Sequence, residues 1–450
     1  GEAGTILFTN SATAGTSSNT IFTNEGSGVA DGRGGSVLFE FDATAGSASF
    51  INEGGTIAEG NGGSVIFNNQ TSAGNATFHN RHGVTQGGFM EFRVESSAGN
   101  ATITNDGGTE EGASPNGEIR FYDTSTAGNA TIISHGGTAT DTRGGRAIFY
   151  DHSNAGTATF ENHSNIGQSG LVDFRGQSTG GTATIYNYRE ADASHFGGGM
   201  TRFYEQSNAG SATIENEGTV GAGIYGGYTL FTDSANAGTA QIHNRGNAIS
   251  TDEFLGATRF SGSSHAASST ITNWSGTASG GTGGRTYFYQ NASADLATII
   301  NKGANISGTD GGYTYFRENS GAGSAEISNY GGEVTGAGAG YTRFAESATA
   351  DSAIIRTYGS LQAGGIGGSG QIFHTYSVYG RGNEETLGTY MYLDITPKGR
   401  NETGPNHNLT DWVRLHDRYD AGGHVDMTGR YHAPEAPHAC CATGKEVPST

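Results

Sequence analysis

Apolar and polar residues alternate in short runs along most of the chain, and these runs return at a regular interval. A phenylalanine recurs every 25 to 31 residues from Phe8 to Phe373. An A-T-I run follows it, in which Ala212 and Ile214, for example, fall on the same side of an extended chain. Period-two alternation is typical of a β-strand with one buried face. The pattern therefore predicts two short strands in each repeat of about 28 residues.

The two halves of the repeat differ in how much their length varies. An asparagine, or Ser134 or Thr357 in its place, lies 13 residues after the phenylalanine in every repeat except the first, where the interval is 16. From the asparagine to the next phenylalanine the interval varies from 12 to 16 residues. We therefore expect the Gly-Gly-rich second half to carry the turns, where changes of length are tolerated. Between the two strands, Gly210 and its equivalents predict a backbone conformation that a side chain would penalise.

Stacking of the repeats would bury the apolar side that one short strand leaves exposed. The chain is therefore predicted to be all-β, a single-stranded parallel β-helix (β-solenoid) of about 13 coils and about 60 Å in length. Its core would contain a phenylalanine ladder: Phe39, Phe67, Phe92, Phe121, Phe149, Phe174, Phe203, Phe231, Phe260, Phe288, Phe316, Phe344 and Phe373. The asparagines would form a second ladder of hydrogen-bonded amides: Asn24, Asn52, Asn80, Asn105, Asn162, Asn187, Asn216, Asn244, Asn273, Asn301 and Asn329.

The organisation of the chain changes after the last repeat. We assign residues 1–375 to the solenoid and 376–431 to a small β-rich module or end cap. Residues 432–450 read as a tail containing proline and cysteine. Five of the six prolines lie beyond residue 375.

Composition narrows the class of protein. Glycine contributes 78 of 450 residues without the period of collagen, and 22 phenylalanines and 20 tyrosines argue against a disordered linker. The net charge of −20 disfavours nucleic-acid binding. No apolar stretch is long enough for a transmembrane helix. Gly1 in place of a methionine indicates a processed product or a fragment.

Few residues in the sequence indicate a binding or catalytic site. The tyrosines and arginines beside the phenylalanines alternate with them and should point outward, as an ordinary solvated surface or as a binding face; examples are Arg202, Arg259, Arg343, Tyr122, Tyr150 and Tyr204. The acidic residues, such as Glu53, Asp106, Glu161 and Glu215, form no evident column with lysine or arginine, so no catalytic residue is assigned. No cofactor or metal is expected, because the histidine-rich end lacks a zinc spacing. Adjacent Cys440 and Cys441 are candidates for an intermolecular disulfide or for free thiols.

The run AGNATITNDGG, Ala98 to Gly108, resembles repeats of bacterial surface-exported proteins, both autotransporter passengers and filamentous-haemagglutinin-like adhesins. This resemblance implies a secreted or surface-held bacterial β-helix, extracellular or on the cell surface. It says little about activity.

Three functions remain open. The first is an extracellular structural protein that self-associates head to tail into a fibre or sheath, because the repeat is already running by residue 4 and leaves its first coil uncovered. The second is a surface adhesin that binds a glycan or host partner through the exposed face or the carboxy-terminal module. The third, less favoured, is a polysaccharide-active β-helix enzyme.

Overall fold

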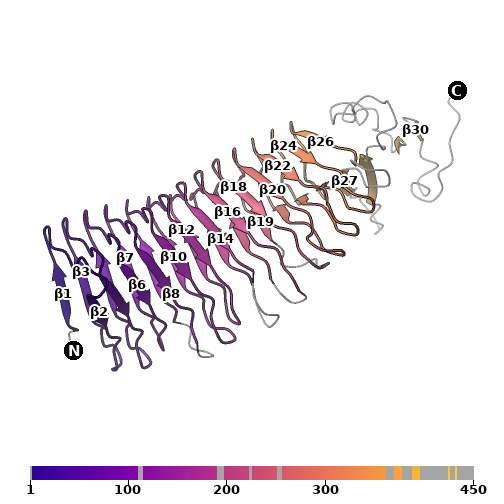
Figure 1. The fold of residues 1–450 in the computed structure, drawn as a ribbon. Helices are drawn as coiled ribbons and strands as arrows, with labels where there is room; N and C mark the ends of the chain where they lie inside the picture. Colours follow the sequence, from indigo (N-terminus) through magenta and orange to yellow (C-terminus); the bar gives the residue numbers. More distant parts are fainter. Residues whose placement is uncertain are drawn as a thin grey trace, which may run out of the picture.

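The protein is an all-β parallel β-solenoid with the shape of a long rod (Figure 1). The structure is a computed structural model that describes residues 3–109, 115–189, 197–221, 225–250 and 256–360. Beyond these it describes the backbone of strands within 369–377, 388–395, 424–425 and 431–432. The described part contains no helix, and hence none that could cross a membrane.

One long sheet contains a strand from every coil, and each of these strands ends on a phenylalanine; we call it the phenylalanine sheet. Its parallel strands lie in chain order. They are β1 (Thr5–Phe8), β3 (Ser36–Phe39), β5 (Ser64–Phe67), β7 (Phe89–Phe92), β9 (Glu118–Phe121), β11 (Arg146–Phe149), β13 (Leu171–Phe174), β15 (Met200–Phe203), β17 (Tyr228–Phe231), β19 (Ala257–Phe260), β21 (Arg285–Phe288), β23 (Tyr313–Phe316) and β25 (Tyr341–Phe344).

The second sheet has 13 strands, which end on the asparagine or its substitute; we call it the asparagine sheet. Its strands are β2 (Ile21–Asn24), β4 (Ser49–Asn52), β6 (Thr77–Asn80), β8 (Thr102–Asn105), β10 (Thr131–Ser134), β12 (Thr159–Asn162), β14 (Thr184–Asn187), β16 (Thr213–Asn216), β18 (Gln241–Asn244), β20 (Thr270–Asn273), β22 (Thr298–Asn301), β24 (Glu326–Asn329) and β26 (Ile354–Thr357). Between the two sheets, single residues from Thr13 to Thr349 form a third column of parallel bridges.

The core lies between the two sheets. Phe203 pairs in register with Phe231 on the next coil, and their rings stack with centroids 4.6 Å apart. In the amino-terminal coils, Phe67 also meets Phe78 of the asparagine sheet edge to face at 5.9 Å. The ladder from Phe39 to Phe344 is at most 1% exposed. Stacking therefore buries the apolar side of each four-residue strand, as one strand alone could not.

The asparagine side chains also point inward. Each amide group donates to the next across the coils, as Asn244 does to Asn273 at 2.8 Å. Nine such bonds span 2.7–2.9 Å. The ladder is interrupted at Ser134, whose buried hydroxyl has no partner within the described residues.

The inward position two residues before each phenylalanine changes character halfway along the rod. From coil β3 to coil β13 it is apolar, as with Val37 and Val172, whereas from coil β15 onward it is threonine. These buried hydroxyls bond to the asparagines, for example Thr229 Oγ1 to Asn216 Oδ1 at 2.9 Å. The carboxy-terminal half of the core is therefore more polar and more extensively hydrogen-bonded than the amino-terminal half.

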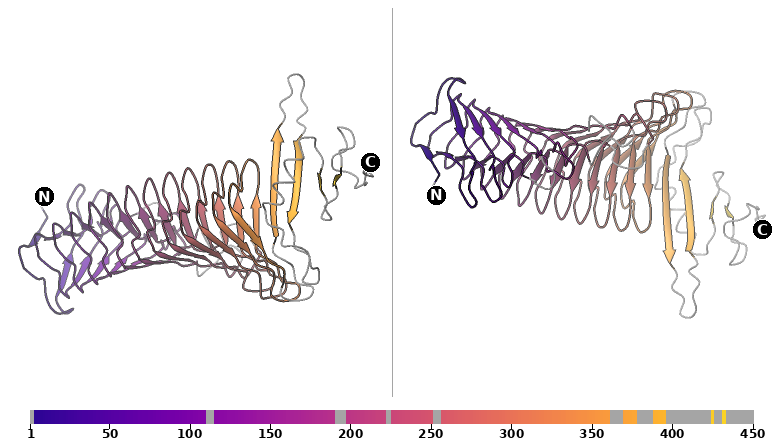
Figure 2. Two further views of the ribbon diagram at one scale, coloured as in Figure 1. Left: turned by 90° about the horizontal axis from the view of Figure 1, so that it is seen from above. Right: turned by 90° about the horizontal axis from the view of Figure 1, so that it is seen from below.

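At the carboxy-terminal end, two further strands extend the phenylalanine sheet. Strand β27 (Ser369–Ser377) pairs parallel with β25, and β28 (Gly388–Ile395) pairs antiparallel with β27 (Figure 2). The register sets Ile372 opposite Phe344, so Phe373, which the spacing assigned to the ladder, falls one residue further along. Two short strands, β29 (His424–Val425) and β30 (Tyr431–His432), pair with each other. Cys440 and Cys441 lie outside the described residues.

Candidate binding face

The outer face of the phenylalanine sheet is the most chemically distinctive surface of the rod. Three positions of each coil belong to it: the residues three before, one before and one after the phenylalanine. Arg202 and Tyr204 illustrate the last two. Because the strands stack in register, each position forms a row along the rod.

The rows divide into two halves of different chemistry. The ion-pair half, on β7 to β15, contains Glu91, Arg93, Glu118, Arg120, Tyr122, Arg146, Tyr150, Asp173, Arg175, Arg202 and Tyr204. The Tyr/Arg half, on β17 to β25, contains Tyr228, Arg259, Arg285, Tyr287, Tyr289, Tyr313, Tyr315, Arg317, Tyr341 and Arg343.

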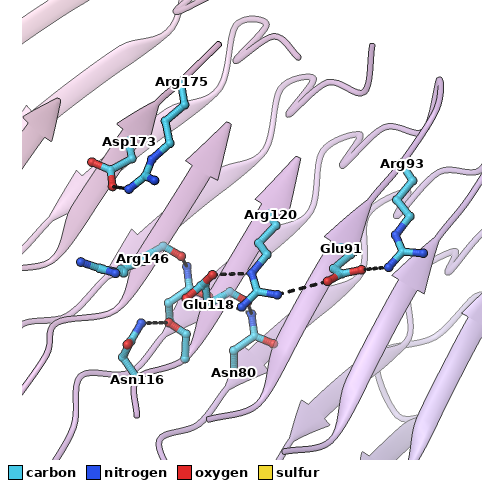
Figure 3. Close-up of polar contacts among 11 residues, drawn as sticks. Asn80, Glu91, Arg93, Asn116, Glu118, Arg120, Arg146, Asp173 and Arg175 are labelled. Atoms are coloured by element: carbon cyan, nitrogen blue, oxygen red, sulfur yellow. Dashed lines mark hydrogen bonds and ion pairs between the residues drawn. The ribbon is translucent and has the colours of Figure 1, made fainter. Parts of the chain in front are cut away.

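Carboxylates in the ion-pair half are held by guanidinium groups of the same coil and of the next coil (Figure 3). Glu91 Oε1 accepts from Arg120 Nη1 at 3.3 Å, and Glu91 also pairs with Arg93. Arg120 in turn pairs with Glu118. Burial lowers the pKa of Arg120, but the charge and hydrogen bond of Glu118, with smaller contributions from Tyr122 and Glu91, outweigh this effect and raise that pKa overall. Arg120 therefore stays charged and links two coils.

Asp173 is the most enclosed of these carboxylates. Its side chain is 0% exposed although it points to the outer side of the sheet. Arg202 binds it through Nε at 2.6 Å and Nη2 at 2.8 Å, and Arg175 Nη2 donates at 3.2 Å. The hydrogen bonds from the two arginines offset the free-energy cost of removing this carboxylate from water. They also cover the carboxylate, so that it cannot reach a substrate.

Arg146 lies in the same half and forms no ion pair among the described residues. It is adjacent in register to Glu118. Burial lowers the pKa of its guanidinium group, and the charge of Asp173 partly offsets this. The pKa of an arginine is so high that Arg146 remains charged at neutral pH.

Tyrosines flank the ion pairs. The rings of Tyr122 and Tyr150 stack at 4.9 Å, and Arg175 lies over Tyr150 at 5.8 Å and over Tyr204 at 5.6 Å. Burial raises the pKa of all three phenols.

In the Tyr/Arg half, Arg259, Arg285 and Arg343 have aromatic rings as neighbours, whereas Arg317 pairs with the carboxylate of Glu346. Arg259 lies over Tyr289 at 4.5 Å, and Arg343 lies over Tyr315 at 5.2 Å. None of the outward positions of β17 to β25, all of which are described, is aspartate or glutamate. The pattern of residues thus changes from paired charges to tyrosine-supported arginines along one face.

Sequence reasoning anticipated that tyrosines and arginines would point outward but missed the ion-pair half. The carboxylates singled out from the sequence, Glu53, Asp106, Glu161 and Glu215, lie at outward positions of the asparagine sheet, on a different face. There Glu53 pairs with Arg81 at 2.7 Å and Glu215 with Arg245 at 2.8 Å. These partners lie one coil apart, and aligning the repeats at the phenylalanine would have revealed them.

No group of three or more potential metal ligands occurs among the described residues. The histidine-rich carboxy-terminal segment lies mostly outside them.

Comparison with known proteins yields one partial match. Residues 349–419, a small part of the chain that includes β26, β27 and β28, match a family described as bacterial protein of unknown function (DUF899). No curated protein and no solved structure matches the chain. The chain therefore combines a β-solenoid with a carboxy-terminal segment similar to a bacterial family.

Proposed function

We propose that this protein is a bacterial extracellular rod that acts as an adhesin, binding its partner through the outer face of the phenylalanine sheet. The observation that carries the proposal is the set of in-register rows of tyrosine and arginine from β7 to β25. Tyrosine and arginine are, together with tryptophan, the residues enriched at the energetic centres of interfaces. The extracellular location rests on the resemblance of the repeats to those of bacterial surface-exported proteins.

The solenoid gives this face a rigid support. The stacked phenylalanines and the hydrogen-bonded asparagines lie directly beneath the outward rows and fix the spacing of successive coils. Side chains on such a scaffold lose little conformational freedom on binding. Catalysis is not part of the proposal, because the three carboxylates of the ion-pair half, Glu91, Glu118 and Asp173, are all engaged by arginines.

The test compares two triple variants. One replaces Tyr287, Tyr289 and Tyr315 with serine, and the control replaces three tyrosines of the asparagine sheet side, Tyr188, Tyr330 and Tyr358. Binding of the labelled protein to bacterial and host cells is measured by flow cytometry. We expect saturable binding that weakens at least tenfold in the face variant and less than twofold in the control. No saturable binding, or equal loss in both variants, would refute the adhesin.

A second candidate, head-to-tail assembly, is favoured by the first coil. Strands β1 and β2 are edges of their sheets, and Ile6, Leu7 and Ile21 are 46%, 53% and 62% exposed. A second copy could extend these strands. At the opposite end, β26 is the edge of the asparagine sheet, whereas the phenylalanine sheet ends on antiparallel β28. The two ends are therefore complementary in strand direction only along the asparagine sheet.

Light scattering over a range of concentrations, with electron microscopy, tests assembly. Filaments that shorten when Ile21 is replaced by glutamate would support it. A monomer at all concentrations would argue against it.

A further inference from the structure

The Tyr/Arg half offers mainly hydrogen-bond donors. Its charged groups are four arginines, whose guanidinium groups only donate, and one of them, Arg317, already pairs with Glu346. Tyrosine hydroxyls supply further donors. With no carboxylate at the outward positions of β17 to β25, this part of the face complements a ligand that is rich in acceptors and negatively charged.

The rings of this half present their edges and hydroxyl groups rather than their faces. Tyr313 and Tyr341 stack on each other along the rod at 5.1 Å, and Tyr313 and Tyr315 lie 5.8 Å apart within one strand. Faces packed against each other are not open to a flat ligand. Burial raises the pKa of the Tyr313 and Tyr289 phenols, so both hydroxyls keep their protons and remain donors at neutral and mildly alkaline pH.

Aromatic rings hold the arginines in place before any ligand arrives. Arg259, Arg285 and Arg343 lie 4.5 Å, 5.8 Å and 5.2 Å from the centroids of tyrosine rings. Guanidinium groups fixed in this way lose less entropy when they bind an anion. They belong to β19, β21 and β25, and are therefore spaced by about 5 Å and about 10 Å along the rod.

A row of acidic residues borders this half and limits the width of a ligand. Asp233, Glu318 and Glu346 follow the phenylalanines by two residues, and their carboxylates accept from backbone amides of the preceding coil at 3.0–3.1 Å. They would repel a wide polyanion. Together with a net charge of −20, this row disfavours nucleic acid, whose charge density is high.

We propose that the Tyr/Arg half binds a linear acidic polysaccharide lying along the rod, with its carboxylate or sulfate groups on Arg259, Arg285 and Arg343. The inference rests on the proposed function, since it names the ligand of the same face. A narrow chain with an acidic group every few ångströms matches Arg259 and Arg343, which share the row one residue before the phenylalanines. It also reaches Arg285 in the neighbouring row, three residues before the phenylalanine, and it avoids the acidic border. Tyrosine hydroxyls would donate to its sugar oxygens.

The experiment measures binding of the whole chain to four immobilised polymers by biolayer interferometry. Alginate carries carboxylates, dextran sulfate carries sulfates, dextran is neutral, and poly(dT) is a single-stranded nucleic acid. The face variant combines Arg259→Gln, Arg285→Gln and Arg343→Gln. Its matched control combines Arg81→Gln, Arg245→Gln and Arg356→Gln on the asparagine sheet, removing the same charge from a chain of net charge −20. Circular dichroism verifies that both variants fold.

We expect saturable binding to alginate or dextran sulfate that weakens at least tenfold in the face variant, less than twofold in the control, and steadily with added salt. Arg→Lys replacements at the same three positions should restore part of the affinity, because they keep the charge and lose the fork geometry.

Several results would overturn the inference. Equal binding to dextran would indicate a neutral glycan, and tighter binding to poly(dT) would indicate a nucleic acid. If no polyanion binds but the tyrosine variant still abolishes cell binding, the adhesin function is retained and the acidic polysaccharide is rejected as its ligand. Equal weakening in the control would indicate nonspecific charge attraction.

Discussion

At the scale of single residues, the buried asparagines use most of their hydrogen-bonding capacity. Asn216 donates to Asn244 Oδ1 at 2.9 Å and to Thr258 Oγ1 at 3.2 Å. It accepts from Asn187 Nδ2 at 2.8 Å and from Thr229 Oγ1 at 2.9 Å. A polar column in an apolar core is stable only while its members stay paired, because an unpaired buried group loses its hydration without compensation.

Replacing Asn216 with leucine should destabilise the protein by about 3 kcal/mol, because it leaves polar groups on both neighbouring coils short of a partner. Denaturant titration followed by circular dichroism measures the change. Asn100→Ala is the control, since Asn100 belongs to an exposed row of asparagines bonded at 3.0 Å and 3.1 Å, and should lose less than about 1 kcal/mol. Equal losses would mean that the buried ladder has no special importance.

The sequence placed the asparagines on a ladder but not the threonines that support it. Thr229 lies two residues before Phe231, so period-two alternation already puts both on the inner side. A threonine in a strand is usually interpreted as a surface residue, and only the packing of two sheets brings its hydroxyl to Asn216. The outward tyrosines and arginines followed from the same alternation, whereas the pairing of Glu91 with Arg120 needed the register.

At the same scale, a single residue, His243, should make the stability of the protein depend on pH. Its ring is half-buried on the outer side of the asparagine sheet, 3.9 Å from Glu215 and beside Trp274 and Arg245. Its Nδ1 is buried with no hydrogen-bond partner in the described part of the chain. Burial lowers the pKa of His243; Glu215 opposes this and Arg245 reinforces it.

Because this pKa is depressed in the folded state, the unfolded chain binds the proton more readily. The contribution of neutral His243 to stability is therefore fully present above the ordinary histidine pKa of about 6.5. The free energy of unfolding should fall as the pH decreases below that value. His243→Gln should flatten the dependence of the unfolding midpoint between pH 7 and pH 5, whereas exposed His152→Gln should leave it unchanged. A steeper profile in the His243 variant would mean that attraction to Glu215 dominates.

At the scale of elements, the turns accept only certain residues. In most coils the left-handed corner between the two strands is occupied by glycine, such as Gly210 at φ +61°, as the sequence predicted, whereas Ala267, Asp295 and Asp351 adopt the same conformation in three coils. The Gly-Gly pairs exclude side chains for a different reason. A Cβ atom on Gly227 would lie 1.9 Å from the carbonyl oxygen of Asn187 on the preceding coil. The second glycine of the pair thus permits the backbone of one coil to cross that of the coil before it.

Gly227→Ala should destabilise the protein by at least about 2 kcal/mol, because the clash is with backbone and cannot be relieved by a rotamer change. Gly359→Ala is the matched control, since an added Cβ there meets nothing within 4 Å. Thermal unfolding of both variants checks the prediction. A similar midpoint for the two proteins would show that the coils can separate enough to admit a methyl group.

The element that sequence spacing misplaced is the last one. Phe373 continues the interval of the ladder, but β27 is nine residues long and pairs with β28, so its register follows the hairpin and sets Ile372 against Phe344. Spacing predicts register only while the repeat is intact, and it fails where a strand acquires a partner from outside the repeat.

At the scale of the whole molecule, each coil contacts only its neighbours, and stability is a sum of interfaces along the rod. The first coil has a neighbour on one side in the described structure, whereas central coils have two. The apolar exposure of Ile6, Leu7 and Ile21 adds to this difference. The amino-terminal coil should therefore open most easily, which is also the coil that the assembly hypothesis would cover.

Hydrogen exchange measured by mass spectrometry at two protein concentrations can examine both ideas at once. At low concentration, amides of β15 should exchange at least about a hundredfold more slowly than those of β1, because opening the end coil breaks one interface with a neighbour whereas opening a central coil breaks two. If copies associate head to tail along the asparagine sheet, raising the concentration should slow exchange in β2 and leave β15 unchanged, since only the end strand acquires a new partner. Uniform protection at both concentrations would contradict the additive picture and indicate one cooperative unit. If the difference in exchange rate between the end coil and β15 does not change with concentration, the rod is a monomer. The outer face of the phenylalanine sheet would then be its means of attachment.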